Sequence, residues 1–368
     1  MSARASLALL VLGGAAAIAA ALASPASAGS AASQAWPAFA LVGGLLLVGA
    51  VAAQEGVFAA TGTLASRAPG GAAVLLVALL LIEAVVTAVL NLDTAVVFMT
   101  PVLLHAARQR GVPDGPFLYG AVFMANSASL LLPGSNLTNL IVLRHEHLTG
   151  STFAARLAPP WAVAVAVTIV FVLVAFRHEL AGRSRAVPDH VAFRPRWGAA
   201  GIAVSVVLVL VLANPALPVL GVGIAVALLS RLPLRHGLDS LNPALLLGVL
   251  GVAIGLGALA RNVGWLSSLL DHAGRWETAW VAAGAALLVN NLPAAVVLSA
   301  HVPPHPRALL LGLDLGPNLA VTGSLAAVLW LQVARANGAR PSILRYSLFG
   351  LALVPLTLGL ALLSPVKL

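Results

Sequence analysis

Cysteine is absent from this chain of 368 residues, and charged side chains make up only 8% of it. Without cysteine there is no disulfide framework, no thiolate metal site and no cysteine nucleophile. Soluble globular proteins carry roughly 25% charged residues. Here 60% of the residues are apolar and the mean hydropathy is +1.02. A soluble core could not bury so much apolar surface, so the sequence predicts an all-α polytopic membrane protein, multi-pass in the inner (plasma) membrane.

Basic residues exceed acidic ones, but their distribution does not suit nucleic acid. The net charge is +9, the only Lys is Lys367, and the Arg residues fall in short gaps between apolar runs. This is the positive-inside pattern of membrane proteins rather than a stripe that follows phosphates. We therefore expect the lipid bilayer, and no nucleic acid, as the surrounding partner.

Motifs for enzyme chemistry are also missing. The sequence has no Walker motif, no GxSxG and no HExxH, so it predicts neither ATP hydrolysis nor hydrolase activity, and no cofactor. Acidic and imidazole side chains at span ends or in loops are expected to be solvated, although the two histidines at 145 and 147 could hold a metal weakly: Glu55, His105, His145, His147, His301 and His305.

Apolar runs long enough to cross a bilayer, about 20 residues each, recur along the chain. Residues 1–28 predict a first membrane helix or a cleaved signal peptide. Trp36, Trp161 and Trp197 stand at the starts of spans, as interfacial anchors do. The runs lie near residues 6–24, 35–56, 71–107, 117–143, 159–176, 197–213, 215–231, 241–260, 276–300, 308–333 and 346–364.

Two of these runs, 71–107 and 276–300, are interrupted near their middles by polar residues. If both are re-entrant hairpins, the basic loops all fall in the cytoplasm and the uncharged loop 25–34 falls outside. The first hairpin then opens to the cytoplasm and the second to the exterior, which is an inverted-topology repeat. The alternative is that both runs are ordinary crossings. The Arg residues that decide the count are Arg4, Arg67, Arg108, Arg110, Arg177, Arg183, Arg185, Arg194, Arg196, Arg231, Arg235, Arg335, Arg340 and Arg345.

This interpretation divides the chain into two repeats around a basic connection. Repeat 1 covers 35–176, with a hairpin at 71–107 and a broken helix at 117–143. The basic loop and connecting helices cover 177–240. Repeat 2 covers 241–364, with a hairpin at 276–300 and a broken helix at 308–333.

The two hairpin interruptions resemble each other in sequence. Aligning residues 91–97 with 291–297 gives five identities in seven positions, Asn-Leu at the break among them. Each is followed by a second broken span, with Pro133-Gly134 in one and Gly316-Pro317 in the other. Proline removes a backbone donor and glycine relaxes the backbone, so both spans should unwind. Unwound backbone inside a membrane is tolerated only where protein buries it or water reaches it.

Such breaks suit binding, because half-helix N-termini present N–H groups to anions or hydroxyls and freed oxygens coordinate cations. We expect the four breaks to form one polar cage around a small inorganic substrate; simple helix packing by small polar residues is the alternative. Asp93 and Asp314 are candidate proton carriers, because acidic residues inside a membrane are usually functional. Glu83 is expected to be a structural partner. The substrate-binding candidates are Asn91, Thr94, Ser135, Asn136, Asn139, Asn290, Asn291, Thr322, Gly323 and Ser324.

Five motifs carry a resemblance to a known family: Asn91-x-Asp93-Thr94-Ala95, Ser135-Asn136-Leu137-x-Asn139, Asn290-Asn291-Leu292-Pro293, Asp314-Leu315-Gly316-Pro317 and the run 323–331. In these the sequence resembles the arsenite permease (ArsB-type) branch of the ion transporter superfamily, over residues 35–364. That superfamily also contains NhaD-type sodium/proton antiporters and sodium-coupled dicarboxylate transporters.

The resemblance implies an elevator-type carrier, with a fixed scaffold domain and a transport domain made of the two hairpins and two broken helices. It further implies export of arsenite or antimonite in exchange for protons, a homodimer through the scaffold, and a soluble ATPase subunit in some systems. Leu92 separates Asn91 from Asp93 where the family has Asn directly before Asp. Asn126, a further coupling candidate, stands where the family pattern predicts Asp.

Other functions stay open at this point. A sodium/proton antiporter or a sodium-coupled anion carrier would depend on Na⁺. A channel would conduct without coupling. A membrane-embedded enzyme would need a catalytic pair, and the sequence offers none. Because cysteine is absent, arsenite would have to be held as its neutral trihydroxide through the OH groups.

Overall fold

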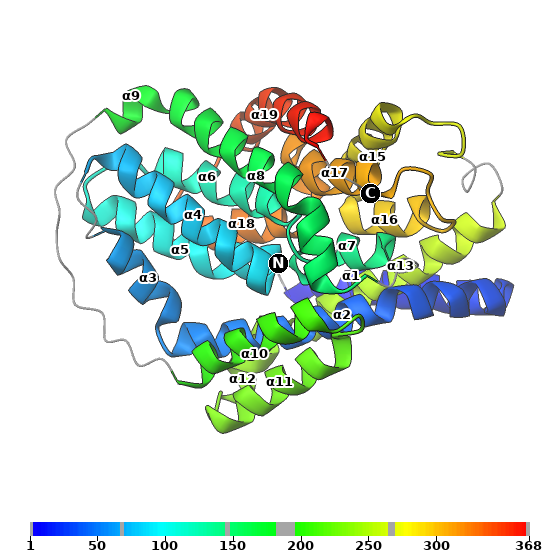
Figure 1. Cartoon of the computed structure of the whole chain (residues 1–368). Helices are drawn as coiled ribbons and strands as arrows, with labels where there is room; N and C mark the ends of the chain where they lie inside the picture. Colours follow the sequence, from blue (N-terminus) through cyan, green and yellow to red (C-terminus); the bar gives the residue numbers. More distant parts are fainter. Residues whose placement is uncertain (1–2, 67–69, 144–147, 182–195, 264–268, 366–368) are drawn as a thin grey trace.

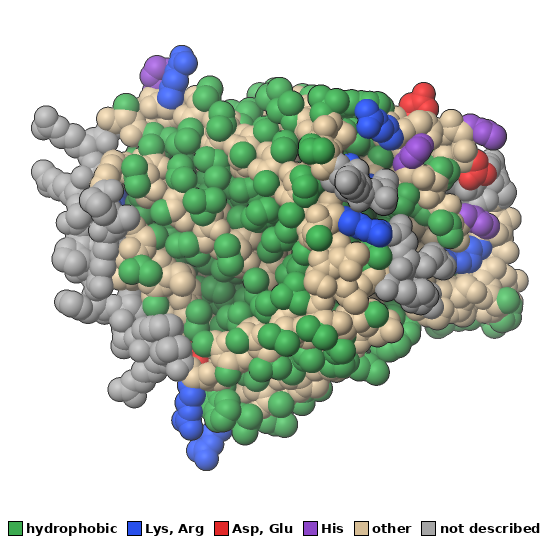
Figure 2. Space-filling model, viewed as in Figure 1, with side chains coloured by type: hydrophobic (Ala, Val, Ile, Leu, Met, Phe, Trp, Pro, Cys, Tyr) green, Lys and Arg blue, Asp and Glu red, His purple; other side chains and the backbone are tan. Residues whose placement is uncertain are grey.

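The computed structural model describes residues 3–66, 70–143, 148–181, 196–263 and 269–365, and every regular element among them is a helix (Figure 1). Six helical stretches in these ranges are long and apolar enough to cross a bilayer: Ser6–Ala23, Pro25–Gln54, Ala72–Leu90, Gly150–Ala175, Leu234–Asn262 and Ile343–Leu363. In Figure 2 apolar side chains are spread over much of the visible face, while the basic and His side chains lie in its right-hand part and at its upper and lower left. The chain is therefore an all-α, multi-pass membrane protein. Sequence predictions for Arg67, His145, His147, Arg183, Arg185 and Arg194 concern residues outside these ranges.

One layer of the fold is built on the long helix α2 (Pro25–Gln54). Helices α1 (Ala3–Ala23) and α13 (Pro243–Asn262) pack together beside it, and α10 (Trp197–Val211), α11 (Ala216–Leu229) and α12 (Leu234–Leu241) pack on it from below in Figure 1. The α1–α13 contact is close because glycines line it: a Cβ on Gly13 would lie 2.0 Å from the carbonyl oxygen of Gly248. Small residues let membrane helices approach this closely.

The prediction of an external loop at 25–34 is wrong. Those residues form the first three turns of α2, and Ser24 alone separates α1 from α2. The segment is rich in alanine, a strong helix former, and Pro25 occupies the first helical position, where a missing N–H costs nothing. Trp36 therefore lies inside α2 rather than at the start of a span. Trp161 lies inside α8 (Gly150–Ala175), which begins eleven residues earlier, and its indole donates to the carbonyl of Ala128 at 3.1 Å. Of the three tryptophans, only Trp197 begins a helix.

The helices α10 and α11 are shorter than the spans predicted for them. They contain 15 and 14 residues, or about 22 Å each at 1.5 Å per residue, against a hydrocarbon core of about 30 Å. The two helices pack against each other as consecutive elements. If both helices cross the membrane, or if neither does, the chain leaves α11 on the same side of the membrane from which it entered α10. The side of the membrane predicted for the later elements is therefore the same in both cases.

Each of the two interrupted runs forms a helical hairpin with a single residue at its tip. Asn91 joins α4 (Ala72–Leu90) to α5 (Leu92–Gln109), and Asn290 joins α15 (Arg275–Val289) to α16 (Asn291–Leu298). Both asparagines have positive φ, 125° and 77°, a conformation that asparagine tolerates better than most residues. The tips therefore correspond at Asn91 and Asn290, one residue away from the sequence alignment of Asn91 with Asn291.

The second broken spans unwind at their Pro and Gly residues. One consists of α6 (Asp114–Ala128), the short 3₁₀ turn η1 (Pro133–Ser135) and α7 (Leu137–Val142). The other consists of α17 (Pro306–Leu315), the 3₁₀ turns η3 (Gly316–Leu319) and η4 (Val321–Gly323), and α18 (Leu325–Ala336). Helices α8 and α19 (Ile343–Leu363) follow the two spans and pack against each other.

The two halves of the chain pack crosswise. Helix α5 of the first hairpin packs against α18, while α16 of the second hairpin packs against α7. Each hairpin thus touches the final half-helix of the other half, which brings all four breaks into one region. This is the contact pattern that an inverted repeat would produce; the opposite orientation of the halves across the bilayer stays a prediction.

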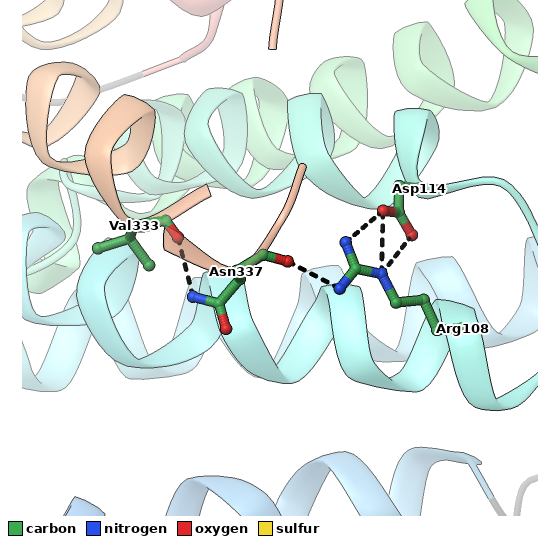
Figure 3. Close-up of polar contacts among 4 residues, drawn as sticks. All are labelled: Arg108, Asp114, Val333 and Asn337. Carbon is green, nitrogen blue, oxygen red and sulfur yellow. Dashed lines mark hydrogen bonds and ion pairs between the residues drawn. The ribbon is translucent and has the colours of Figure 1, made fainter. Parts of the chain in front are cut away.

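The open end of the first hairpin is tied to its neighbours by polar contacts. Arg110 donates to the carbonyl of Gly70 at 3.1 Å, which holds the two ends of the hairpin together. Arg108 forms an ion pair with Asp114 at 2.6 Å and donates to the carbonyl of Asn337 at 2.8 Å (Figure 3). The pair is exposed, so it contributes little stability by itself. It fixes α5, α6 and the end of α18 relative to one another.

Glu55 was predicted to be solvated, but the structure gives it a capping role. Its two carboxylate oxygens accept the backbone N–H groups of Arg196, Trp197 and Gly198, each at 2.9 Å. These are the unsatisfied donors at the start of α10, and a negative charge there also suits the helix dipole.

We expect Glu55→Ala to lower the free energy of unfolding by about 1 to 2 kcal/mol, the usual cost of a lost N-cap. Thermal unfolding in detergent, followed by tryptophan fluorescence, measures the effect. Glu55→Gln keeps one carbonyl oxygen and should lie between wild type and Glu55→Ala. Equal melting temperatures for all three proteins would show that the cap does not hold α10.

Candidate functional site

A cavity of about 270 Å³ lies where the four breaks meet. Its polar wall consists of the first residues of α5, α7, α16 and α18, together with the capping residues that precede three of these helices. Its opposite wall is apolar and comes from α1 and α13, through Leu9, Leu245, Val249 and Val252. The predicted site residues that line the cavity are Asp93, Asn136, Asn290, Asn291 and Ser324.

Each of the four half-helices begins with a side-chain cap. Asn91 accepts the N–H of Thr94 at 2.7 Å, and Ser324 accepts the N–H of Ala327 at 3.1 Å. Asn136 and Asn290 each accept the N–H two residues ahead, at 3.3 and 3.4 Å. A cap satisfies only one of the free donors of the first turn. The N–H groups that then have no acceptor within their own helix are those of Leu92 and Asp93 in α5, Leu325 and Ala326 in α18, and Asn291 in α16, where Pro293 has none. The positive ends of these helix dipoles meet at the cavity.

Among the described residues that line the cavity, Asp93 is the only acidic or basic one. It lies in the first turn of α5 and is 7% exposed. The other polar groups of the lining are amides and a hydroxyl. The cavity therefore offers one carboxylate, several neutral donors and acceptors, and helix N-termini.

Asp314 lies directly behind the cavity. One carboxylate oxygen accepts from the Asn136 amide at 2.9 Å and from the Thr138 hydroxyl at 2.5 Å. The other oxygen is buried without a hydrogen-bond partner among the described residues. Because Asn136 both bonds Asp314 and lines the cavity, it connects this carboxylate to the substrate space.

Asn126 occupies the position in the first half that Asp314 occupies in the second. Each lies ten residues before the cap of the following half-helix, Asn136 or Ser324. The structure does not bring Asn126 to the cavity. Its amide donates to Asn318 at 2.9 Å, and Asn318 lies within 3.4 Å of the Ser127 hydroxyl.

Four other predicted site residues shape the breaks rather than the cavity wall. Ser135 donates to the carbonyls of Ser129 and Leu132, and Asn139 donates to the same two carbonyls at 2.8 and 3.1 Å. The carbonyl of Thr322 accepts from Asn290 at 3.1 Å, which ties the second hairpin tip to the second break. A Cβ on Gly323 would lie 2.7 Å from the Cα of Pro317, so that turn closes only with glycine.

Asn91 and Thr94 are fully buried at the first tip without lining the cavity. The Asn91 amide nitrogen and the Thr94 hydroxyl have no partner among the described residues. Sequence reasoning missed Thr138, Asn318 and Thr168, which donates to Ser127 at 2.8 Å. Thr138 stands between Leu137 and Asn139 of one motif and Asn318 directly follows Pro317 of another, so both have a local sequence signal, whereas Thr168 is isolated in an apolar helix.

A family model described as citrate transporter, CitMHS, matches residues 1–314, most of the chain. The chain belongs to this family. Among curated relatives, the CitMHS chain is 25% identical to a 46 kDa membrane protein of Mycobacterium leprae, over 89% of the chain and 85% of the relative. It is 27% identical to an arsenical pump membrane protein of Escherichia coli, over 69% of the chain and 68% of the relative.

Among solved structures, the CitMHS chain is similar to the YdaH transporter of Alcanivorax borkumensis, with a TM-score of 0.54 over 92% of the chain and 86% of that structure. The sequence identity is 14%, so this similarity concerns the fold alone. Together the comparisons make the chain a membrane transporter of the type that includes citrate transporters and arsenical pump proteins, as the motif resemblance predicted.

Proposed function

We propose that this chain is a secondary active transporter that exports small oxyacids of the arsenite or antimonite type in exchange for protons. The observation that supports it most is the cavity at the four breaks, which combines one carboxylate with amide and hydroxyl caps and has no basic side chain in its lining. The relatives described as arsenical pump membrane proteins favour the same substrate class.

The chemistry of the wall suits a neutral trihydroxide. Each OH group donates one hydrogen bond and accepts others. Asp93 and the side-chain oxygens of Asn291 and Asn136 would accept from the substrate, and the free N–H groups of α5, α16 and α18 would donate to it. No thiolate is needed, which agrees with the absence of cysteine.

Proton coupling would follow from competition at Asp93. An ionised Asp93 accepts hydrogen bonds from the substrate hydroxyls, whereas a protonated Asp93 loses part of its accepting capacity. Release of substrate on the far side would then accompany protonation, and the proton would return with the empty carrier. Asp314 would sense the same event through Asn136, which contacts both the cavity and its carboxylate.

A sodium-coupled anion carrier is the second candidate, because the matching family is described as citrate transporter. A tricarboxylate in this cavity would meet helix N-termini and the Asp93 carboxylate, but no Arg, Lys or His among the lining residues that the structure describes. Bound cations would then have to neutralise part of its charge. Transport by this second candidate therefore requires Na⁺ or another cation. Arsenite export in exchange for protons does not require Na⁺.

A screen with purified protein in liposomes distinguishes the two functions. An imposed pH gradient should drive saturable arsenite or antimonite uptake into liposomes without Na⁺, and liposomes lacking protein are the control. Citrate uptake that requires a cation, with no arsenite flux, would replace the proposal by the second candidate. Flux that neither saturates nor follows the pH gradient would indicate a channel.

Substitutions in the cavity wall should weaken binding. Asn291→Ala removes an amide and Ser324→Val removes a hydroxyl, and we expect each to raise the substrate concentration for half-maximal transport by about tenfold, the effect of one lost hydrogen bond. Initial rates across a substrate series measure it. Asn337→Ala is a suitable control, because the Asn337 side chain is exposed and donates only to Val333 at the end of α18. Unchanged substrate affinity in both variants would show that this cavity wall does not bind the substrate.

The resemblance suggests how the cavity moves. In an elevator mechanism the helices α1, α2 and α10–α13 would stay fixed while the hairpins and broken helices carry the substrate. The cavity lies between these two groups of helices, as such a mechanism requires. The elevator motion, the homodimer and the soluble ATPase subunit are parts of this proposal.

A further inference from the structure

Helix α4 of the first hairpin carries a line of buried polar side chains that the transport cavity does not use. Glu83 and Thr87 are four residues apart on α4, so they lie on one face of the helix, and the tip residue Asn91 follows four residues later. All three are fully buried. Both oxygens of Glu83, the hydroxyl of Thr87 and the amide nitrogen of Asn91 have no hydrogen-bond partner among the described residues.

The prediction that Glu83 is a structural partner is therefore wrong, because neither of its oxygens bonds any residue in the described part of the chain. A buried carboxylate without a partner costs several kcal/mol if it is ionised, whereas a neutral carboxylic acid costs far less. Asp314 differs, since two donors hold one of its oxygens. The surroundings of Glu83 thus favour the carboxylic acid.

No charged group offsets Glu83 from the neighbouring elements. Helix α4 packs against α2, α3 (Val57–Ser66), α5, α6, η1, α8 and α10. Arg108 and Asp114 pair with each other, and Tyr119 bonds Ser342, away from Glu83. The titratable side chains on all these elements are Asp93, His105 and Arg108 on α5, Asp114 and Tyr119 on α6, and Arg156 on α8. Neither oxygen of Glu83 bonds any of them.

The line leads from the middle of the hairpin to the cavity. Glu83 lies eight residues before the tip, about 12 Å along the helix. The Glu83 and Thr87 side chains, four residues apart on the helix, are about 5 to 6 Å apart at Cβ, within reach of one water molecule. The backbone N–H of Asn91 donates to the carbonyl of Thr87 at 3.1 Å, which places the tip directly after Thr87. Two residues beyond Asn91 stands Asp93, in the cavity wall.

We propose that Glu83 is a proton-binding site inside the first hairpin, connected to the substrate cavity through Thr87 and Asn91. The Glu83 carboxylic acid gives its proton to the Thr87 hydroxyl, which releases its own proton to a water molecule held by the Asn91 amide, and that water protonates Asp93. Reprotonation of Glu83 reverses each transfer. The link to Asp93 rests on the proposed function, while the protonation of Glu83 does not.

Infrared spectroscopy of the protein in lipid nanodiscs tests the site without any substrate. At neutral pH the wild-type spectrum should contain a protonated-carboxyl C=O band that Glu83→Gln removes. Thr87→Val, which removes only the hydroxyl, should shift this band. Thr278→Val is the matched control, because Thr278 is a buried threonine in the other hairpin whose hydroxyl has no partner among the described residues; it should leave the band unchanged.

Proton movement in liposomes then tests the connection. We expect Thr87→Val to slow pH-driven exchange by about tenfold or more, as loss of a proton-transfer group does, with Thr278→Val at the wild-type rate. A band that survives in Glu83→Gln, or one that Na⁺ abolishes, overturns the proton site. Equal rates in the two threonine variants overturn the connection. If Glu83→Gln does not fold, two other measurements test the proton site: the pH dependence of the wild-type carboxyl band, and the shift of that band in Thr87→Val. An arsenite-inactive protein that keeps the Glu83 band contradicts the proposed function but not this site.

Discussion

Asp93→Asn should abolish pH-driven transport while leaving the protein folded in the membrane. The substitution keeps the size of the side chain but removes the carboxylate, the one titratable group among the described residues of the cavity lining. The introduced amide can still accept a hydrogen bond from a hydroxylated substrate. The variant should therefore still bind substrate, with an affinity that no longer depends on pH. Uptake into inverted vesicles, driven by an imposed pH gradient, should fall to the level of vesicles without the protein.

Binding and expression must be measured beside transport for this result to be informative. Substrate protection against thermal unfolding should remain in Asp93→Asn, and immunodetection should show wild-type amounts. Asp314→Asn is the comparison: the Asn136 and Thr138 contacts hold its carboxylate, so this variant should lose stability as well as transport. Unchanged pH-driven uptake in Asp93→Asn would remove Asp93 from the coupling mechanism.

Gly350→Ala should have the largest effect on stability. Gly350 lies where α19 crosses η3, and a Cβ there would lie 1.9 Å from the carbonyl oxygen of Asn318. Backbone on both sides leaves nothing flexible to move, so α19 must shift away from the second break. Overpacking of this kind costs about 1 to 3 kcal/mol.

The same helix supplies a control. A Cβ on Gly359 would meet nothing within 4 Å, so Gly359→Ala should be neutral or slightly stabilising. The melting temperature in detergent, measured for both variants, isolates the close contact from a general effect of alanine in α19. A pair of equal melting temperatures would mean that α19 and η3 are not in contact in the membrane.

Much of the fold follows from local chemistry. Asparagine at a tip, and proline with glycine in a span, each predict the end of a helix. The hairpin helices end at Asn91 and Asn290 because asparagine tolerates the positive φ found there. The loop predicted at 25–34 failed for an equally local reason. Residues 25–34 were expected to form a loop, whereas Pro25 at the first helical position only starts a new helix.

The contacts of the site could not be predicted in the same way. Thr138 and Asp314 are 176 residues apart in sequence, and no local pattern pairs them. The sequence alignment paired Asn91 with Asn291 because both precede a leucine. The structure pairs Asn91 with Asn290, because these two residues have the positive φ of the hairpin tips, which the sequence does not show. Glu83 was given a partner because buried acids usually have one, and only the packed structure shows that its oxygens bond none of the described residues.

The crosswise packing of the halves has a consequence for any shortened form of this protein. The first hairpin rests on α18 and the second on α7, so neither half of the chain can complete a binding wall from its own residues. A product that ends after α8 would keep Asp93 and Asn136 but lose Asn290, Asn291 and Ser324 of the same polar wall. We expect transport to return only when the second half is expressed as well and packs against the first. The two halves would then complement each other, and neither would transport alone.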